Sequence, residues 1–302
     1  MENLTDIKVI KDIFERHGFS FSKALGQNFL VNPTVCPRIA EMGGAAPGTG
    51  IIEIGTGVGV LTHELAKRAD KVVAIEIDER LIPILEETLA EHKNVRIINA
   101  DVMKIDLAEV IKENFGGMKV AVCANLPYYI TSPIIMMLLE SRLPLTSITV
   151  MVQKEAGTRL CAEMGTRDVG AVTAAVRYYS EPKLLFNVSR GSFMPSPNVD
   201  SCVIKLDIHN DGRYKAQDEE FFFKTVRGAF SQRRKNLLNS LSSSMGMEKA
   251  LIAKAVENSG IPTNARPEQL SMEEFLRLAE ELDLMRNSEF GMIDIQYKCN
   301  KK

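Results

Sequence analysis

Short β-rich runs alternate with helix-like stretches through the first two-thirds of the chain, and this alternation most restricts the fold. The β-rich runs are residues 51–54, 71–75, 95–98, 120–124, 147–153 and 202–206. Most are separated by segments of helical periodicity, such as 61–69, 80–91 and 133–140. This order is typical of parallel strands joined by helical crossovers. The sequence therefore predicts an α/β fold with a Rossmann-like, doubly wound and mostly parallel sheet.

The pattern changes after residue 206. Residues 207–217 are polar and contain glycine, and the periodic segments beyond them are helical: 218–241, 248–259 and 271–282. We expect Ser271 and Glu274 to form a capping box that starts the last helix, because they are three positions apart. A smaller, all-helical C-terminal domain is therefore predicted.

A domain boundary is placed near residue 209, which agrees with a length of 302 residues at about 150 residues per domain. The α/β domain covers residues 1–209 and the helical domain covers 210–284. Residues 285–302 have weak periodicity and end in two lysines, which indicates a disordered tail of unknown role.

Composition and charge exclude several classes of protein. With 45 % hydrophobic and 25 % charged residues, the chain is typical of soluble globular proteins. No apolar run reaches the ~18 residues needed to span a bilayer, and the first 18 residues predict an amphipathic helix rather than a signal peptide. The five cysteines form no C-x-x-C pair, so neither a disulfide framework nor a metal site is expected. A cytoplasmic monomer is the expected form.

A glycine-rich turn follows the first predicted strand of the α/β pattern. Gly55, Gly57 and Gly59 lie between that strand and an apolar helix, so the backbone at Gly55 and Gly57 could approach a ligand whose polar group lies near the helix N-terminus. A glycine-rich connection with no ligand is the alternative, because the motif alone is weak.

Polar residues follow the next three strands in turn. Glu76 lies 21 residues beyond Gly55, near the spacing expected of an acid that binds ribose hydroxyls, and Asp101 and Asn125 end the third and fourth strands. The loop reads G-x-G-x-G rather than the G-x-G-x-x-G of nicotinamide-dependent dehydrogenases, which disfavours that class. A carboxylate at Asp101 suits an adenine amino group, so an S-adenosylmethionine site fits better.

The four residues after the fourth strand, Asn125, Leu126, Pro127 and Tyr128, suit the methylation of an adenine N6 amine. The Asn125 amide oxygen and the Leu126 carbonyl could each accept one amine hydrogen, Pro127 would fix the chain and Tyr128 would stack on the base. An ordinary strand-to-helix turn is the alternative. Methyl transfer is an in-line displacement governed by positioning, so no general base is nominated. Phe193 is the candidate for the opposite face of the base, or else a core anchor.

Five segments together resemble the ribosomal RNA adenine dimethylase family, and the bacterial small-subunit enzymes within it most closely. They are KALGQNFL at 23–30, EIGTGVG at 53–59, NLPY at 125–128, PSPNVDS at 195–201 and FSQRRKNLL at 230–238. The resemblance runs from about residue 19 to residue 282. It implies that four methyl groups pass from S-adenosylmethionine to N6 of two adjacent adenines in the 3′-terminal hairpin loop of small-subunit rRNA, within an assembling 30S particle.

The resemblance also implies the cofactor contacts. They carry over to Asn28, Leu30, Gly55, Glu76, Asp101 and Asn125, to which Gly57 is added from the glycine turn. Thr56 stands where many members have proline, which should matter little because the backbone makes the contact. Tyr129 stands where many have asparagine, so the main stacking ring is either Tyr128 or Tyr129.

A basic cluster in the helical half contrasts with the net charge of −2 for the whole chain. Its members, with no acid among them, are Lys224, Arg227, Arg233, Arg234 and Lys235. We expect them to bind RNA phosphates, although a solvated helix face is the alternative.

Two other functions remain open from the sequence. A 23S-type adenine dimethylase that confers macrolide resistance would share the NLPY motif, but residues 195–201 and 230–238 favour the small-subunit enzyme. A non-catalytic assembly or transcription factor on the same fold would bind nucleic acid without chemistry, which the intact motif argues against.

Overall fold

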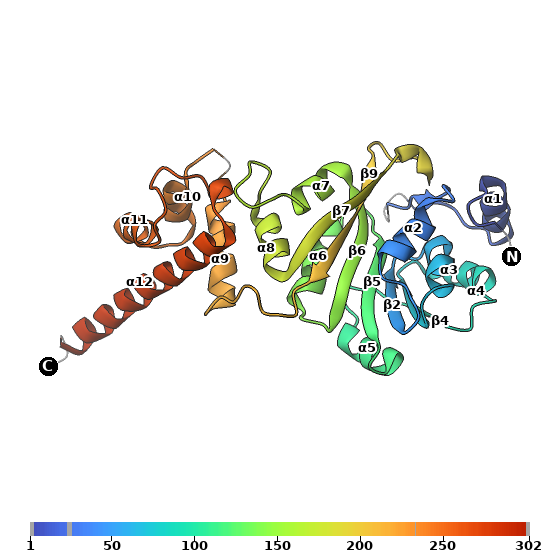
Figure 1. Cartoon of the computed structure of the whole chain (residues 1–302), viewed down its shortest axis with the longest axis horizontal. Helices are drawn as coiled ribbons and strands as arrows, with labels where there is room; N and C mark the ends of the chain where they lie inside the picture. The colour runs from blue at the N-terminus through green and yellow to red at the C-terminus, as the bar shows by residue number, and fades with distance from the viewer. Residues whose placement is uncertain (1–2, 23–25, 233, 300–302) are drawn as a thin grey trace. The chain divides into compact units, whose positions relative to one another are not determined.

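The computed structural model describes residues 3–22, 26–232 and 234–299, and the chain forms two compact units (Figure 1). The first unit consists of Met1–Cys161 and Tyr179–Ile208, and the second of Ala162–Tyr178 and His209–Lys302. Residues 162–178 thus belong with the C-terminal helices although they precede residue 209. The boundaries drawn from the sequence stay a prediction.

The first unit is built on a seven-stranded sheet in the order β4-β3-β2-β5-β6-β9-β7. Its strands are β2 (Thr49–Ile54), β3 (Lys71–Glu76), β4 (Val95–Asn99), β5 (Lys119–Asn125), β6 (Leu145–Gln153), β7 (Ser180–Val188) and β9 (Ser201–Ile208). Strands β2 to β6 pair in parallel, and β9 runs antiparallel to both β6 and β7. The predicted doubly wound, mostly parallel sheet is confirmed.

Helices connect successive parallel strands of this sheet (Figure 1). The helices of the first unit are α1 (Ile7–Arg16), α2 (Val35–Met42), α3 (Val60–Ala66), η1 (Glu79–Leu81), α4 (Ile82–Thr88), α5 (Leu107–Phe115), α6 (Thr131–Glu140), α7 (Lys154–Leu160) and η2 (Arg190–Ser192). Aspartate side chains cap the N-termini of two of these helices: Asp6 accepts from the Lys8 amide in α1, and Asp106 accepts from the Ala108 and Glu109 amides in α5. A short second sheet pairs β1 (Phe29–Leu30) with β8 (Phe193–Met194).

The central strands are apolar on both faces, as expected of a parallel sheet covered by helices on each side. Ile51 and Ile52 on β2, and Val72 and Val73 on β3, are all fully buried. On one face, Ile51 and Val72 pack in a core with Ile39 of α2 and other residues of α2 and α3. This packing holds the strand ends, and the residues that follow them, in fixed positions.

The second unit is helical where the structure describes it. It contains α8 (Ala171–Tyr179) apart from its last residue, α9 (Glu219–Ala229), α10 (Leu237–Ser244), α11 (Lys249–Asn258), η3 (Pro267–Gln269) and α12 (Met272–Cys299). Its core includes Phe222, Leu241, Ile252 and Phe275, all fully buried. The predicted capping box is confirmed, because the Ser271 amide donates to Glu274 Oε2 (2.8 Å) and the Glu274 amide donates to Ser271 Oγ (3.2 Å).

Two sequence predictions about this half are wrong. Residues 218–241 are not one helix, because α9 ends at Ala229 and Asn236 caps a new helix by accepting from the Asn239 amide (3.0 Å). Residues 285–299 are not a disordered tail, because α12 continues through them to Cys299. In the part of the chain that the structure describes, no helix is long and apolar enough to cross a membrane.

Candidate active site

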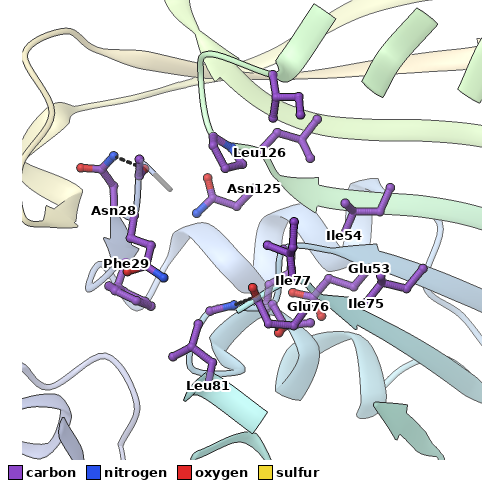
Figure 2. Close-up of a pocket in the computed structure, with 18 of the residues that line it drawn as sticks. Asn28, Phe29, Glu53, Ile54, Ile75, Glu76, Ile77, Leu81, Asn125 and Leu126 are labelled. Carbon is purple, nitrogen blue, oxygen red and sulfur yellow. Dashed lines mark hydrogen bonds between the residues drawn. The ribbon is translucent and has the colours of Figure 1, made fainter. Parts of the chain in front are cut away.

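A pocket lies where β2, β3, β4 and β5 end, which is the switch point of the doubly wound sheet. All residues predicted for catalysis or cofactor binding line it. They are Asn28, Leu30, Gly55, Gly57, Glu76, Asp101, Asn125, Leu126, Pro127, Tyr128 and Phe193. Figure 2 shows several of these side chains around the pocket. The sequence prediction that these residues come together is confirmed, while the role of each stays a prediction.

The Glu76 carboxylate is fixed at the end of β3 by three donors. Its Oε2 accepts from the Gly57 amide (3.1 Å) and the Thr56 hydroxyl (3.2 Å), and its Oε1 accepts from the Asp78 amide (2.9 Å). Burial raises the pKa of Glu76 above its ordinary value, against the effect of these donors. The result is a buried acceptor with a defined orientation, as a ribose diol requires.

Thr56 also contributes through its side chain, while the expectation that a threonine in place of proline matters little to the backbone contact stays a prediction. Its hydroxyl is buried and donates to Glu76, whereas a proline here would supply no such donor. The spacing of the glycines indicates only a turn, and only the structure shows that residue 56 faces the acid of the next strand.

The glycine turn brings bare backbone to the pocket. Gly55 and Gly57 have φ angles of 75° and 59°, a left-handed conformation that other residues rarely adopt. A Cβ on Gly57 would lie 3.1 Å from the Phe29 ring of the N-terminal motif. The left-handed conformation at both positions, and the nearby Phe29 ring at Gly57, therefore favour glycine in this turn.

Asn125 ends β5 with its amide directed into the pocket. Figure 2 shows this side chain between the segment that carries Asn28 and the strand end that carries Glu76. Among the described residues, the Asn125 amide has no hydrogen-bond partner, whereas Asn28 Nδ2 donates to the Gly26 carbonyl (3.0 Å). An unpaired amide that lines a pocket is available to bind a polar ligand.

The turn after Asn125 is held by hydrogen bonds and burial. The Pro127 carbonyl accepts from both the Ile130 amide (3.2 Å) and the Thr131 hydroxyl (3.1 Å), which starts α6. Leu126 is buried at 2 % exposure. These contacts hold the peptide that links Asn125 to Tyr128.

The two aromatic candidates differ in their surroundings. Tyr128 is half-buried, and its hydroxyl lies 2.6 Å from the Ser201 hydroxyl at the start of β9. Burial raises the pKa of Tyr128, so the phenol stays protonated at neutral pH. Phe193 is buried at 5 % exposure and opposes Leu30 in the β1–β8 pair, so it packs in the core as well as lining the pocket.

Asp101 lies beyond β4 at the same edge. Its Oδ1 accepts from the Met103 amide (3.0 Å), and its Oδ2 lies 3.4 Å from Lys104 Nζ. The carboxylate is thus held by its own turn and still lines the pocket.

Glu53 also lines the pocket, although no role was predicted for it from the sequence. It is 1 % exposed, and its Oε2 has no hydrogen-bond partner in the described part of the chain. Burial, with the nearby charge of Glu76, raises the pKa of Glu53 to about 8. Asp78, which is outside the pocket lining, supports Glu76 and was also not predicted from sequence: its amide donates to Glu76 Oε1, and its carboxylate accepts from Gln27 Nε2 (2.7 Å) and pairs with Arg80. An acid two positions after Glu76 is the only sequence signal for it.

The basic cluster lies on α9 and in the turn that follows. Lys224, Arg227, Arg234 and Lys235 are exposed, and none has an acidic partner within 4 Å among the described residues. Arg233 lies outside the described residues. No cluster of three or more His, Cys, Asp or Glu side chains that could hold a metal ion occurs among the described residues.

Comparison with known proteins shows the family. The pattern described as "Ribosomal RNA adenine dimethylase" matches residues 18–284. The chain belongs to the ribosomal RNA adenine dimethylase family. As a member, it is an enzyme that methylates ribosomal RNA adenines with S-adenosylmethionine as cofactor.

Two relatives of this dimethylase are close over nearly their whole length. Proteins named ribosomal RNA small subunit methyltransferase A from Alkaliphilus oremlandii and Bacillus cytotoxicus are 46 % and 48 % identical, and each alignment covers 93 % of this chain. The alignments cover 99 % and 98 % of those proteins.

Solved structures agree on the fold. The 23S rRNA methyltransferase ErmE is 28 % identical with a TM-score of 0.66, over 85 % of this chain and 100 % of that one. A dimethyladenosine transferase from Plasmodium falciparum has a TM-score of 0.69 at 24 % identity, over 85 % of this chain and 98 % of that one.

The pocket residues of the dimethylase fit S-adenosylmethionine. Glu76 offers a fixed carboxylate for a diol at the end of β3, and Asp101 offers an acceptor after the adjacent strand β4. Gly55 and Gly57 offer bare backbone after β2, which adjoins β3 on its other side. When bound, the cofactor supplies an electrophilic methyl group on a positively charged sulfur. The unpaired Asn125 amide, at the neighbouring strand end, would face both this cofactor and a base entering the pocket.

Proposed function

We propose that this dimethylase transfers four methyl groups from S-adenosylmethionine to N6 of two adjacent adenines in the 3′-terminal hairpin loop of 16S rRNA. The substrate is the assembling 30S particle, and the enzyme acts as a cytoplasmic monomer. The observation that carries the proposal is the unpaired Asn125 amide at the head of the NLPY turn, in the same pocket as Glu76. The names of the relatives that are 46–48 % identical support the small subunit as the target.

The chemistry depends on orientation of the amine. The lone pair of an adenine N6 is delocalised into the ring, so the amine must be held with that lone pair directed at the methyl donor. Asn125 Oδ1 and the Leu126 carbonyl accept the two N6 hydrogens, and the hydrogen bonds on the Pro127 carbonyl keep this turn rigid.

No general base is assigned to the reaction. The methylated amine is acidic after transfer and loses its proton to water. Tyr128 stacks on one face of the base and Phe193 packs against the other. The hydroxyl of Tyr128 is held by its contact with Ser201. Loss of the proton from the methylated amine restores the single N6 lone pair, which attacks the methyl group of a second S-adenosylmethionine. The monomethylated amine has one hydrogen left, which either Asn125 Oδ1 or the Leu126 carbonyl accepts.

The basic cluster holds the RNA. Lys224, Arg227, Arg234 and Lys235 are exposed without acidic partners among the described residues, which suits phosphate contacts, and we include Arg233 by sequence.

The alternative targets are less well supported. The 23S enzyme ErmE is 28 % identical, against 46–48 % for the small-subunit relatives. A non-catalytic factor would have no need of an open amide at Asn125 beside a cofactor pocket. Macrolide-resistance assays on cells that express this protein distinguish a 23S-type dimethylase from the small-subunit enzyme, because only the 23S-type enzyme would confer resistance.

The test is to map N6-dimethyladenosine in rRNA from cells that lack this protein. The proposal expects both adenines of the small-subunit 3′ hairpin to be unmodified and to regain four methyl groups on complementation. Full modification in the deletion strain, or loss of modification in 23S rRNA instead, would overturn it.

A further inference from the structure

Two consecutive tyrosines at the pocket have different surroundings. Tyr128 is half-buried and bonded to Ser201, whereas Tyr129 also lines the pocket but is 62 % exposed. The other strongly exposed apolar side chain in the pocket lining is Ile77, at 54 %, directly after Glu76. Among the described residues, Tyr129 is thus the one exposed aromatic at the pocket.

The Tyr129 ring has a defined position in spite of its exposure. Its Cδ1 and Cε1 atoms lie 3.4 Å from the point where a Cβ on Gly26 would stand, and Pro127 Cβ lies 3.6 Å from that point. Gly26 has a φ of 59°, and its carbonyl accepts from Asn28 Nδ2 (3.0 Å). One edge of the ring therefore lies beside Gly26, at van der Waals distance from where a side chain there would begin, while most of the residue's surface faces solvent.

A fixed and solvent-facing ring beside a base pocket is suited to stacking. Sequence-specific RNA recognition uses unpaired bases that stack on aromatic side chains, and a ring that is already positioned loses little entropy on binding. Isolated exposed apolar residues are common on protein surfaces and need no explanation. Tyr129 differs because it belongs to the lining of the pocket and follows directly on the turn that grips the amine.

We propose that Tyr129 stacks on the nucleobase adjacent to the adenine held at Asn125. This inference rests on the proposed function, in which the two target adenines are neighbours, so the base on Tyr129 is the second target or its flanking nucleotide. Consecutive residues of the protein then hold consecutive bases of the RNA, with Tyr128 inside the pocket and Tyr129 at its edge.

Three full-length variants separate stacking from packing. Tyr129→Phe keeps the ring, Tyr129→Leu keeps an apolar side chain against Gly26 without a flat face, and Tyr129→Ala removes both. The measurements are KM and kcat for undermethylated small subunits, the Kd for S-adenosylmethionine by calorimetry, and the thermal midpoint.

The expected result is a split between the variants. Y129F keeps the wild-type KM, whereas Y129L and Y129A raise KM by about tenfold, within the range of alanine substitutions at base-stacking aromatics. All three retain cofactor affinity within about twofold, because Tyr129 makes no contact with Glu76 or the glycine turn in this account.

Two outcomes overturn the inference while leaving the proposed function intact. If the wild type methylates small subunits and Y129L matches its KM, Tyr129 does not stack on RNA. If Y129L loses cofactor affinity in proportion to activity, its role is to support the Gly26 loop. A wild-type protein that fails to methylate undermethylated small subunits contradicts the proposed function itself, and with it the assignment of Tyr129.

Discussion

The Tyr128 hydroxyl lies 2.6 Å from the Ser201 hydroxyl, which links the turn after β5 to the first residue of β9. These two residues are 73 positions apart in the chain. Ser201 is fully buried and Tyr128 is half-buried, so the bond is partly shielded from competing water. It holds the hydroxyl end of the ring that we propose to stack on one face of the base.

Loss of this bond should slow methyl transfer without weakening cofactor binding. Ser201→Ala and Tyr128→Phe each remove one partner, and we expect each to lower kcat by roughly three- to tenfold, the effect of about 1 kcal/mol of lost positioning. The double variant should be no slower than the slower single variant, because both changes remove the same interaction. Additive losses in single-turnover rates would show that the two hydroxyls act separately.

Glu76→Gln should weaken cofactor binding. The amide can accept fewer hydrogen bonds than the carboxylate held by Gly57 and Asp78, so we expect the Kd for S-adenosylmethionine to rise by about ten- to a hundredfold. The exposed neighbour Glu79 supplies the matched control, Glu79→Gln, which should bind normally. Unchanged calorimetric binding by E76Q would remove Glu76 from the ribose role.

Cofactor affinity should also fall as the pH is lowered. Burial raises the pKa of Glu76, so the carboxylate becomes protonated at a higher pH than an ordinary glutamate would. The wild-type affinity should therefore decline on acidification, whereas E76Q should show a flatter profile over the same range. Parallel profiles would assign the pH dependence to another group.

Glu53 should make the folded protein less stable as the pH rises. Its pKa of about 8 in the folded state lies above the ordinary value of 4.5, so folding favours the protonated form. The stabilisation is complete below about 4.5 and is lost as the pH rises through about 8. Relative to Glu53→Gln, the wild type should lose on the order of a few kcal/mol of unfolding free energy across that range. Urea unfolding that shows equal pH slopes for the two proteins would refute this.

How far the sequence predicts the site depends on where each residue lies relative to a strand end. Glu76, Asp101 and Asn125 follow successive parallel strands, and such strand ends meet at one edge, so their meeting in one pocket was predictable. The partnership of Tyr128 with Ser201 was not, because it depends on β9 inserting antiparallel between β6 and β7. No local pattern encodes that insertion.

Two other elements escaped prediction for local reasons. Strand β7 contains Pro182 and the exposed Leu184, which obscure its alternation. The sequence pattern does not reveal that α9 ends at Ala229, because helical apolar spacing resumes after Asn236. Asn236 is nevertheless a recognisable signal for the start of a new helix. The capping box at Ser271 and Glu274 was predictable because both partners lie within one turn of sequence.

Neutralising the basic cluster should reduce the salt dependence of binding. Each phosphate contact contributes roughly 0.7–0.9 to the slope of log affinity against log salt, so Arg234→Ala with Lys235→Ala should lower the slope by about 1.5. Lys254→Ala, an exposed lysine on α11, is the control and should leave the slope unchanged. If the double variant and the control have the same slope for ribosomal particles, the cluster does not contact phosphates.

The central claim is that the Asn125 amide and the Leu126 carbonyl grip the adenine amine. The most direct measurement is transfer of labelled methyl groups from S-adenosylmethionine to undermethylated small subunits by the wild type and by Asn125→Ala, with cofactor affinity measured in parallel. We predict that the wild type labels the subunits, while N125A is slower by about a hundredfold or more and binds the cofactor within a few-fold of normal. Equal labelling by the two proteins would contradict the account.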